Sequence, residues 1–372
     1  MKFVVKTTDF QKAISSVEGV ITVREINSIL SKIKVEVDDS KVYLSATDLE
    51  ISIKTSVEAE AISKGNISLP ARQLSSTFKL LNFANTLVEN DENNPTISII
   101  TDAEKKVDYR MNINGMEGDE IKTIAKVDTE ETVEFPCEIL AEMIKKTFYS
   151  VAVEDTRFVF NGLFISNDGD KVSCVGTDGR RLSKVDRVFP TTLPFSEGVI
   201  IPHKAIKEIS KMIETSENGR IGLVDKQIYL SNESIELQCK LIDGTYPDYE
   251  SVIPKSSNYS VRVPREEFQV ALRQAISVAE EPSRQIRLKF SNNQLNLNAS
   301  TPGSTEVNIN INIDYQDEDI VIAFKGDYLV DVLKSIDNPE VIIEFSNQNA
   351  PAVFKDPNDE QFVSVIMPMK IQ

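Results

Sequence analysis

Side chains that could perform covalent or acid–base catalysis are few in this chain of 372 residues. Its one histidine, His203, follows Pro202 at an expected helix start, but no nucleophile lies near it in the sequence. The sequence also lacks a P-loop, a GxSxG elbow and an HExxH helix. The cysteines Cys137, Cys174 and Cys239 are far apart and form no CxxC pair, so we expect reduced core thiols in a cytoplasmic protein. We therefore expect no catalytic residue and no cofactor.

Closely spaced carboxylates are another possible source of chemistry, because paired acids can hold a metal ion. Asp168 and Asp170 flank a glycine in an expected hairpin turn, and Asp317 and Asp319 lie in an expected loop before a strand. Neither pair has the spacing of a calcium-binding loop. We interpret both as solvated turn residues and expect no metal site.

A series of lysines is the clearest constellation of charge. Lys204, Lys207 and Lys211 recur at i, i+3 and i+7 of an expected helix, on a different face from a stripe of isoleucines. Basic residues occupy outward positions on the other expected helices as well: Arg72, Lys79, Lys145, Arg273 and Lys334. One such helix usually means only a solvated face, but recurrence on equivalent helices of an acidic protein indicates a shared surface for a polyanion. Because no aromatic residues interleave with these bases, contact with phosphates is favoured over base stacking.

A second constellation combines an exposed turn with a methionine-rich segment. Residues 177–182 end a strand with a glycine turn and two arginines, and residues 243–249 form a long turn followed by Val252. Residues 366–370 place two methionines around Pro368. Methionine side chains offer adaptable apolar surface that suits varied partners. The alternative is a strand packed into its own domain, for which Pro368 favours an edge position.

The elements that must position these groups repeat three times along the chain. Short strands are expected at residues 2–6, 132–136 and 260–264, and each leads into an amphipathic helix. A strand pair follows, then a strand that runs into a second helix, and then three more strands. This repeat is as long as a domain, well beyond the roughly 20–50 residues of solenoid units. The sequence therefore predicts an α+β protein of three similar domains, each with two helices packed on antiparallel sheets.

Local signals refine these elements. Thr8 and Gln11 predict a capping box at the first helix. Polar segments near residues 128 and 257 predict domain boundaries, which gives domains 1–127, 128–256 and 257–372. No apolar run approaches the roughly 20 residues of a membrane span, so we expect no membrane partner.

The net charge of −17, from 41 basic and 58 acidic residues, argues at first against nucleic acid. Net charge does not say where the charges lie, however. An acidic exterior with one basic surface gives the same sum, so the basic helix faces remain informative.

Taken together, these residues resemble the bacterial DNA polymerase III β subunit family of replicative sliding clamps. The resemblance rests on Thr-Asp-Gly-Arg-Arg-Leu at 177–182, Ile-Asp-Gly-Thr-Tyr-Pro-Asp-Tyr at 242–249, Ile-Met-Pro-Met at 366–369 and the triple repeat. It implies the DNA clamp fold in a head-to-tail homodimeric ring, with helices lining a hole for duplex DNA and sheets outside. The implied function is a processivity factor that tethers the replicative DNA polymerase. The clamp loader and repair proteins would dock through short linear peptides.

The resemblance also implies a partner-peptide pocket between the second and third domains. Its expected residues are Thr177, Gly179, Arg180, Arg181, Leu182, Pro247, Val252, Pro351, Ile366, Met367, Pro368 and Met369. The family often has histidine at the position of Arg180, and some members have arginine at that of Ser251. These departures fall on the polar rim of the pocket and leave its apolar floor unchanged.

On the DNA side, Arg24 matches a DNA-contacting position of the family, and His203 and Lys204 fall where the family places a basic pair. The expected DNA-facing residues are therefore Arg24, Arg72, Lys79, Lys145, His203, Lys204, Lys207, Lys211, Arg273 and Lys334.

Sheet edges are expected at residues 96–100 and 107–111 of the first domain and at 286–290 and 294–299 of the third. Bare edges invite association. Pairing of these edges across two chains would close the implied ring.

An enzyme of DNA repair is the alternative function, a nuclease or nucleotidyl transferase in which Asp178, Asp243 and Asp248 hold magnesium. It predicts metal-dependent turnover, whereas a clamp predicts none. Retention on circular DNA with release upon linearisation would distinguish the two.

Overall fold

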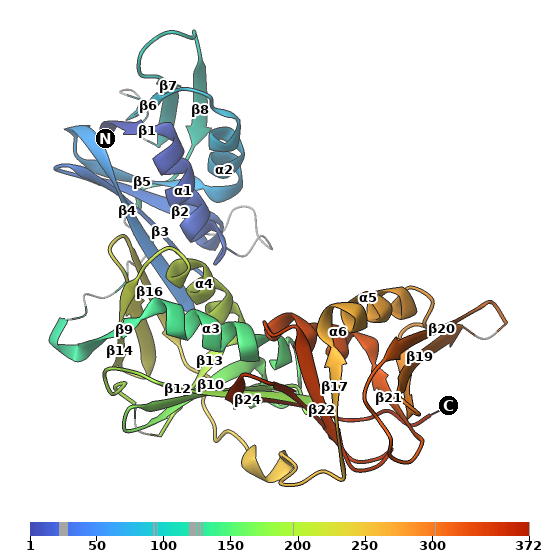
Figure 1. Cartoon of the computed structure of the whole chain (residues 1–372). Helices are drawn as coiled ribbons and strands as arrows, with labels where there is room; N and C mark the ends of the chain where they lie inside the picture. The colour runs from blue at the N-terminus through green and yellow to red at the C-terminus, as the bar shows by residue number, and fades with distance from the viewer. Residues whose placement is uncertain are drawn as a thin grey trace. The chain divides into compact units, whose positions relative to one another are not determined.

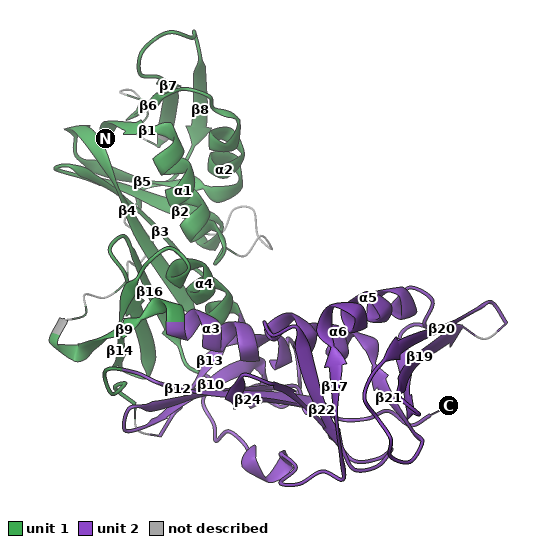
Figure 2. Ribbon diagram, in the orientation of Figure 1, with its two compact units in different colours: residues 1–138, 190–195, 204–241 green, residues 139–189, 196–203, 242–372 purple. Residues whose placement is uncertain are grey.

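The computed structural model describes residues 1–21, 29–91, 94, 96–118, 124, 127, 129–195, 197–301 and 303–371. The chain divides into two compact units (Figure 2). Unit 1 comprises Met1–Glu138, Pro190–Phe195 and Lys204–Leu241, and unit 2 comprises Ile139–Phe189, Ser196–His203 and Ile242–Gln372.

Each third of the chain repeats one order of elements: a strand, a helix, four strands, a second helix and three strands (Figure 1). The sequence pattern predicted the same order with one strand fewer in each third. The additional strands are β4 (Ile51–Ser63), β12 (Arg181–Val188) and β20 (Thr305–Asn312). Each of them follows its hairpin partner across a short turn. Residues 177–182 were predicted to end a strand, but the sheet continues beyond this turn with β12.

Unit 1 is built on one antiparallel sheet among the described residues. Its main path runs β8-β7-β6-β1-β4-β16-β15-β14-β9, and β3, β2 and β5 continue from β4 as a side branch. The strands besides β4 are β1 (Lys2–Lys6), β2 (Lys32–Asp38), β3 (Lys41–Thr47), β5 (Gly65–Pro70), β6 (Asn85–Asn90), β7 (Ile97–Asp102), β8 (Arg110–Asn114), β9 (Thr132–Pro136), β14 (Asn218–Val224), β15 (Gln227–Ser231) and β16 (Ile235–Lys240). Helices α1 (Thr7–Glu18) and α2 (Ala71–Leu80) lie side by side, and α1 packs on β3 and β4. Helix α4 (His203–Ile213) belongs to this unit from Lys204 onward.

Unit 2 contains two antiparallel sheets in the part of the chain that the structure describes. One runs β13-β10-β11-β12-β24-β23-β22-β17, and the other runs β20-β19-β18-β21. Their remaining strands are β10 (Gly162–Asp168), β11 (Lys171–Thr177), β13 (Val199–Pro202), β17 (Tyr259–Pro264), β18 (Gln285–Ser291), β19 (Gln294–Thr301), β21 (Ile320–Lys325), β22 (Glu340–Phe345), β23 (Ala352–Asp356) and β24 (Asp359–Ile366). Helices α5 (Arg265–Ile276) and α6 (Gly326–Ser335) lie side by side, and α3 (Cys137–Thr147) belongs to this unit from Ile139 onward.

The additional strands join one third of the chain to the next. β4 of the first third pairs with β16 of the second, and β12 of the second pairs with β24 of the third. Within the described residues, β20 of the third pairs only with β19, and β8 of the first pairs only with β7. Among the described residues, these two strands are therefore edges with a ladder partner on one side only.

The predicted edges were largely wrong. Residues 96–100, 286–290 and 294–299 correspond to β7, β18 and β19, each of which has a neighbour on both sides. Residues 107–111 only overlap the true edge strand β8. In the third repeat the error arises because β20 was not predicted. β20 pairs with the side of β19 that was expected to be an unpaired edge.

The helices bury the side chains that the periodicity selected. Phe10, Leu140 and Phe268 are each at most 3% exposed, as the repeat alignment predicted. The predicted capping box at Thr8 and Gln11 was wrong, because α1 begins at Thr7 and has no side-chain cap. The Gln11 amide instead donates to the backbone carbonyls of Phe78 and Leu81 at the end of α2, which ties the two helices together.

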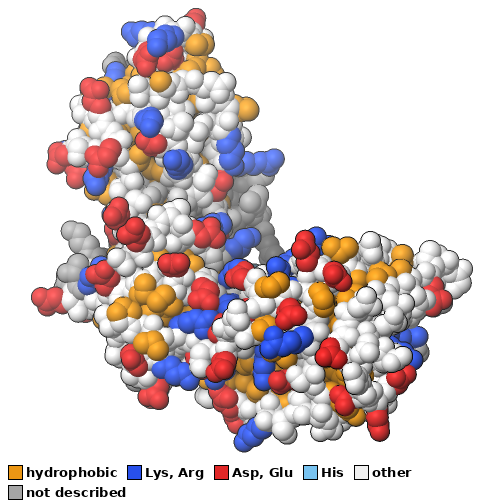
Figure 3. Space-filling view, in the orientation of Figure 1, with side chains coloured by type: hydrophobic (Ala, Val, Ile, Leu, Met, Phe, Trp, Pro, Cys, Tyr) orange, Lys and Arg blue, Asp and Glu red, His pale blue; other side chains and the backbone are white. Residues whose placement is uncertain are grey.

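The three cysteines are buried and form no disulfide. Burial raises the pKa of each thiol, that of Cys239 to about 12. No helix of the described residues is long and apolar enough to cross a membrane. Acidic and basic side chains are interspersed over the face drawn in Figure 3.

Candidate functional site

The turn between β11 and β12 is held by its own side chains. The Thr177 hydroxyl donates to the carbonyl of Arg181 over 2.7 Å and accepts from the amide of Gly179 over 3.0 Å. The Asp178 carboxylate accepts from the amides of Arg180 and Arg181, at 2.9 and 3.0 Å. Gly179 has φ of +81°, and a Cβ there would lie 2.6 Å from the guanidinium of Arg157, so the turn requires glycine.

The long turn before β17 is anchored by a buried aromatic residue. Tyr246 is 8% exposed and stacks on Phe164 with ring centroids 4.7 Å apart. Its hydroxyl donates to the carbonyl of Val175 over 3.3 Å, and burial raises the pKa of this phenol. The anchor leaves Val252, in the short helical turn η6 (Glu250–Val252), 53% exposed.

The C-terminal segment is partly strand and partly extended chain. β24 lies between β12 and β23, so it is an inner strand of the sheet. The edge position that was expected from Pro368 is therefore wrong for β24. Beyond β24, the amide of Met367 donates to the carbonyl of Arg180 over 2.8 Å, and the amide of Met369 donates to Ala323 over 2.7 Å. The segment therefore runs from the turn after β11 to β21.

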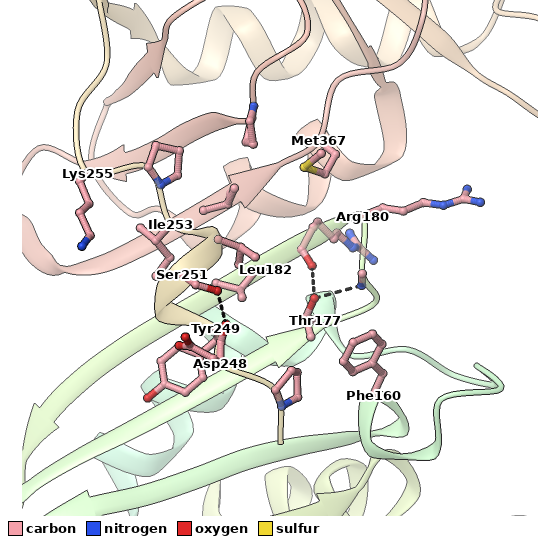
Figure 4. A pocket seen from close by; sticks show the side chains of 17 residues that line it. Phe160, Thr177, Arg180, Leu182, Asp248, Tyr249, Ser251, Ile253, Lys255 and Met367 are labelled. Atoms are coloured by element: carbon pink, nitrogen blue, oxygen red, sulfur yellow. Dashed lines mark hydrogen bonds between the residues drawn. The ribbon is translucent and has the colours of Figure 1, made fainter. Parts of the chain in front are cut away.

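These three segments, with Pro351, surround a cavity of about 620 Å³ (Figure 4). Nine of the expected pocket residues line it: Thr177, Gly179, Arg180, Arg181, Leu182, Pro247, Val252, Pro351 and Met367. Leu182 and Val365 form the floor of the cavity, and both belong to a buried apolar cluster beneath it. The expected residue Ile366 is 1% exposed and does not line this cavity.

Several lining residues were not predicted from the sequence: Phe160, Asp248, Tyr249, Ile253, Pro254, Lys255 and Val365. Asp248 and Tyr249 lie in the long turn, and Ile253, Pro254 and Lys255 follow it closely, so their position in the sequence was a usable signal. Phe160 comes from η5 (Phe158–Asn161), far away in sequence from the other segments, and no local pattern marks it.

A second hollow of about 600 Å³ adjoins the first, because Arg180 and Met367 line both. The other two expected residues, Pro368 and Met369, lie here and not in the first cavity. The remaining lining residues are Pro282, Ser283, Lys325, Tyr328 and Lys370.

The two adjacent arginines of the turn have different surroundings. The guanidinium of Arg181 pairs with Asp178 at 3.1 Å and with Asp331 of α6 at 2.7 Å, and its side chain is 12% exposed. It also lies 4.3 Å from the ring centroid of Tyr328. Among the described residues, Arg180 makes no ion pair. Arg181 therefore fixes the turn to α6, while Arg180 remains available to a ligand.

Two of the three lysines on the basic face of α4 form ion pairs with acidic side chains. Lys204 donates to the carbonyl of Val20 over 2.7 Å and pairs with Asp48 at 2.5 Å. Lys211 pairs at 2.9 Å with Glu208, whose side chain is 3% exposed. Lys207 is exposed and has no ion pair in the described part of the chain. Of the three lysines, Lys207 is the one whose charge is uncompensated.

Some of the other expected DNA-facing residues are close to an acidic side chain, and others are exposed. Lys79 pairs with Glu18 at 3.1 Å, Lys145 with Asp337 at 2.8 Å, and Lys334 approaches Asp331 at 3.9 Å. Arg72 and Arg273 are exposed. The ring of His203 packs on Phe148 with centroids 4.5 Å apart. Arg24 lies outside the described residues.

The carboxylates of the alternative enzyme do not converge. Asp178 already serves the turn and Arg181. Within the described residues, no group of three His, Cys, Asp or Glu side chains is placed to hold a metal ion.

Comparisons with known proteins agree over the full length of the chain. Family models described as the N-terminal, central and C-terminal domains of the DNA polymerase III beta subunit match residues 1–125, 134–248 and 250–370. The beta sliding clamp of Chlamydia pneumoniae is 27% identical over 371 residues, covering 100% of this chain and 99% of that protein.

Solved structures give the same result. A DnaN sliding clamp from Bartonella birtlesii bound to griselimycin is 26% identical, with a TM-score of 0.91 and 100% of both chains covered. The DNA polymerase III subunit beta from Pseudomonas aeruginosa is 25% identical, with a TM-score of 0.88 and the same coverage.

Proposed function

The chain belongs to the DNA polymerase III beta subunit family and is a DNA sliding clamp, and we propose how its parts perform that role. Two copies pair head to tail in a ring that encloses duplex DNA. The ring tethers the replicative polymerase, and the clamp loader and repair proteins use the same docking cavity.

The observation that carries the ring is the pairing rule of the additional strands. β4 pairs with the last strand of the second third, and β12 pairs with the last strand of the third. By the same rule β20 pairs with the last strand of a first third, and that strand is β8 of another copy. Both strands are open edges among the described residues. A head-to-tail pair would cover both edges in each copy and satisfy their backbone groups.

Enclosure makes strong DNA affinity unnecessary. A ring slides only if its contacts with phosphates are few and independent of sequence. A net charge of −17 with isolated free cations such as Lys207 suits that requirement. A strongly basic protein would bind DNA at fixed positions. We propose that the DNA-facing residues act in this way, without catalysis, and that the protein works in the cytoplasm with the bacterial chromosome.

Partner proteins dock by short peptides in the first cavity. Leu182 and Val365 form an apolar floor, and the exposed Val252 and Met367 stand beside it. One or two large apolar side chains of a peptide would bury this surface, while backbone groups at the turn bind its polar atoms. Adaptable methionine surface explains how several partners use one site.

Retention on DNA tests the ring. The protein loaded on nicked circular DNA should stay bound through gel filtration and leave when the DNA is linearised. Sedimentation at micromolar concentration should give a dimer. A monomer, equal retention on linear DNA, or metal-dependent cleavage of the DNA would each overturn the proposal.

A pair of valine variants tests the docking cavity. Val252→Asp should weaken binding of an apolar partner peptide about tenfold or more. Val252 is 53% exposed, so its burial contributes about 0.8 kcal/mol, and the aspartate adds the cost of burying a carboxylate beneath the peptide. Val188→Asp is the matched control, since Val188 is 63% exposed and lies outside the cavity. Equal affinities for both variants would show that the peptide binds elsewhere.

A further inference from the structure

One side of the first cavity is a single continuous segment of the chain, residues 247–255, which we call the cavity wall. Every residue of the wall except Glu250 lines the cavity. Figure 4 shows Ser251 and Lys255 of the wall opposite Arg180. The position of this one segment therefore determines the width of the cavity.

The wall belongs to no strand and has little support of its own. β16 ends at Lys240 and β17 begins at Tyr259, so the wall lies in the connection between them. No wall residue is fully buried, although Tyr249 and Ile253 pack against the apolar cluster beneath the cavity. The hydrogen bonds of its backbone stay within the wall, as in the donation from the amide of Val252 to the carbonyl of Tyr249 over 3.3 Å.

One ion pair joins the wall to the sheet. The ammonium group of Lys184 on β12 donates to the carboxylate of Glu250 over 2.6 Å, and it lies 5.8 Å from the ring centroid of Tyr249. In the described part of the chain, no other hydrogen bond or ion pair connects residues 247–255 to the rest of the protein. Neither Lys184 nor Glu250 lines the cavity, so this contact acts from outside the binding surface.

The charge of Lys184 can be removed without leaving a buried acid unpaired. The side chain of Asp186, 8% exposed, lies 3.4 Å from Lys184. It also pairs with Lys171 at 2.8 Å and accepts a hydrogen bond from the hydroxyl of Ser173 over 2.6 Å. A substitution of Lys184 therefore acts chiefly on Glu250 and on the wall.

We infer that the ion pair of Lys184 with Glu250 holds the cavity wall in the position that docks a peptide. The two side chains are thus positioning residues that set peptide affinity without touching the peptide. The inference rests on the proposed docking of peptides in the first cavity. When the ion pair is absent, the wall is less ordered, and a peptide must order it upon binding at the expense of affinity.

The test uses the full-length protein and an uncharged peptide, so that screening of the peptide's own charge plays no part. The peptide is acetylated and amidated, carries an uncharged fluorophore and has two large apolar residues among serines and glutamines. Lys184→Met and Glu250→Gln should each weaken its binding about twofold to fivefold, since an exposed ion pair contributes up to about 1 kcal/mol. The ratio of wild-type to Lys184→Met affinity should approach one between about 10 mM and 1 M salt, where the Debye length falls from about 30 to 3 Å.

A double variant and a control show whether the pair acts as one unit. Lys184→Met combined with Glu250→Gln should bind no more weakly than either single variant, because the same contact is removed once. Lys289→Met is the matched control. Lys289 pairs with Asp319 at 3.0 Å, and neither residue lines the cavity, so this variant should bind the peptide with wild-type affinity.

Hydrogen exchange measures the position of the wall in the absence of peptide. The amides of Val252 and Ile253 donate within the wall, so their exchange reports its opening. Mass spectrometry of the fragment that spans 247–255 should show exchange about twofold to fivefold faster in Lys184→Met and in Glu250→Gln, and unchanged in Lys289→Met.

The outcomes separate this inference from the docking proposal. Wild-type affinity and wild-type exchange in Lys184→Met, or losses that add in the double variant, would overturn the inference and leave docking intact. If Val252→Asp binds the uncharged peptide as tightly as the wild type, the docking cavity is wrong, and the inferred effect on affinity is overturned with it.

Discussion

The adjacent residues Arg180 and Arg181 should respond in opposite ways to the same substitution. In Arg181→Gln, the carboxylates of Asp178 and Asp331 lose the guanidinium that joins them, and the turn loses this connection to α6. In Arg180→Gln no ion pair of the described residues is broken. Both arginines were predicted to line the pocket, and only their ion pairs in the folded protein distinguish them.

The magnitude follows from burial. The Arg181 side chain is 12% exposed, and the side chains of Asp178 and Asp331 are 17% and 31% exposed. A hydrogen bond to a charged group contributes about 1.5–3 kcal/mol when it is dry, and residual access of water to the acids lowers this figure. Two such bonds and a cation–π contact together give about 2–3 kcal/mol. The corresponding decrease in melting temperature is about 5–10 °C.

Thermal unfolding followed by far-ultraviolet circular dichroism measures the effect, since the chain contains no tryptophan. Arg181→Gln should melt earlier and bind apolar peptides less tightly, because the turn that carries Leu182 is no longer fixed. Arg180→Gln should melt with the wild type. Equal melting temperatures for the two variants would refute the assignment of Arg181 as the residue that positions the turn.

The remaining predictions concern unit 1, the DNA-facing residues and acid stability. Lys207→Ala should lower the salt dependence of DNA binding by about one unit of log–log slope, whereas Lys240→Ala on β16 should not, as measured by DNA binding in a salt series. Gly19→Ala should destabilise the protein by about 1–3 kcal/mol in urea denaturation, because its Cβ would lie 2.4 Å from the buried carboxylate of Glu208, and Glu208→Asp should restore part of the loss. The hydrogen bond from Arg187 holds the pKa of Glu142 below its usual value. The ionised Glu142 therefore stabilises the fold above about pH 4.3, and this stabilisation is lost as the pH falls through the lowered pKa. Arg187→Gln should therefore flatten the decrease of melting temperature between about pH 5 and 3.

Local patterns in the sequence determined the repeat, the helices and their buried faces. Positions such as Phe10, Leu140 and Phe268 are apolar at helical spacing, and burial of one face follows from that spacing alone. The three segments of the candidate pocket were also visible, because a glycine turn, a proline-containing long turn and two methionines around Pro368 each have a local signature.

Only the tertiary structure decided which strands are edges and which charges are free. β20 follows β19 across a short turn, so that pairing is local. Its place as an edge is not local, because the corresponding strands β4 and β12 are covered by β16 and β24, which lie far away in sequence. The ion pairs of Lys204 with Asp48 and of Arg181 with Asp331 join distant elements for the same reason. Charge spacing along one helix shows where a lysine points. Whether its charge is available depends on acids that the fold brings from elsewhere.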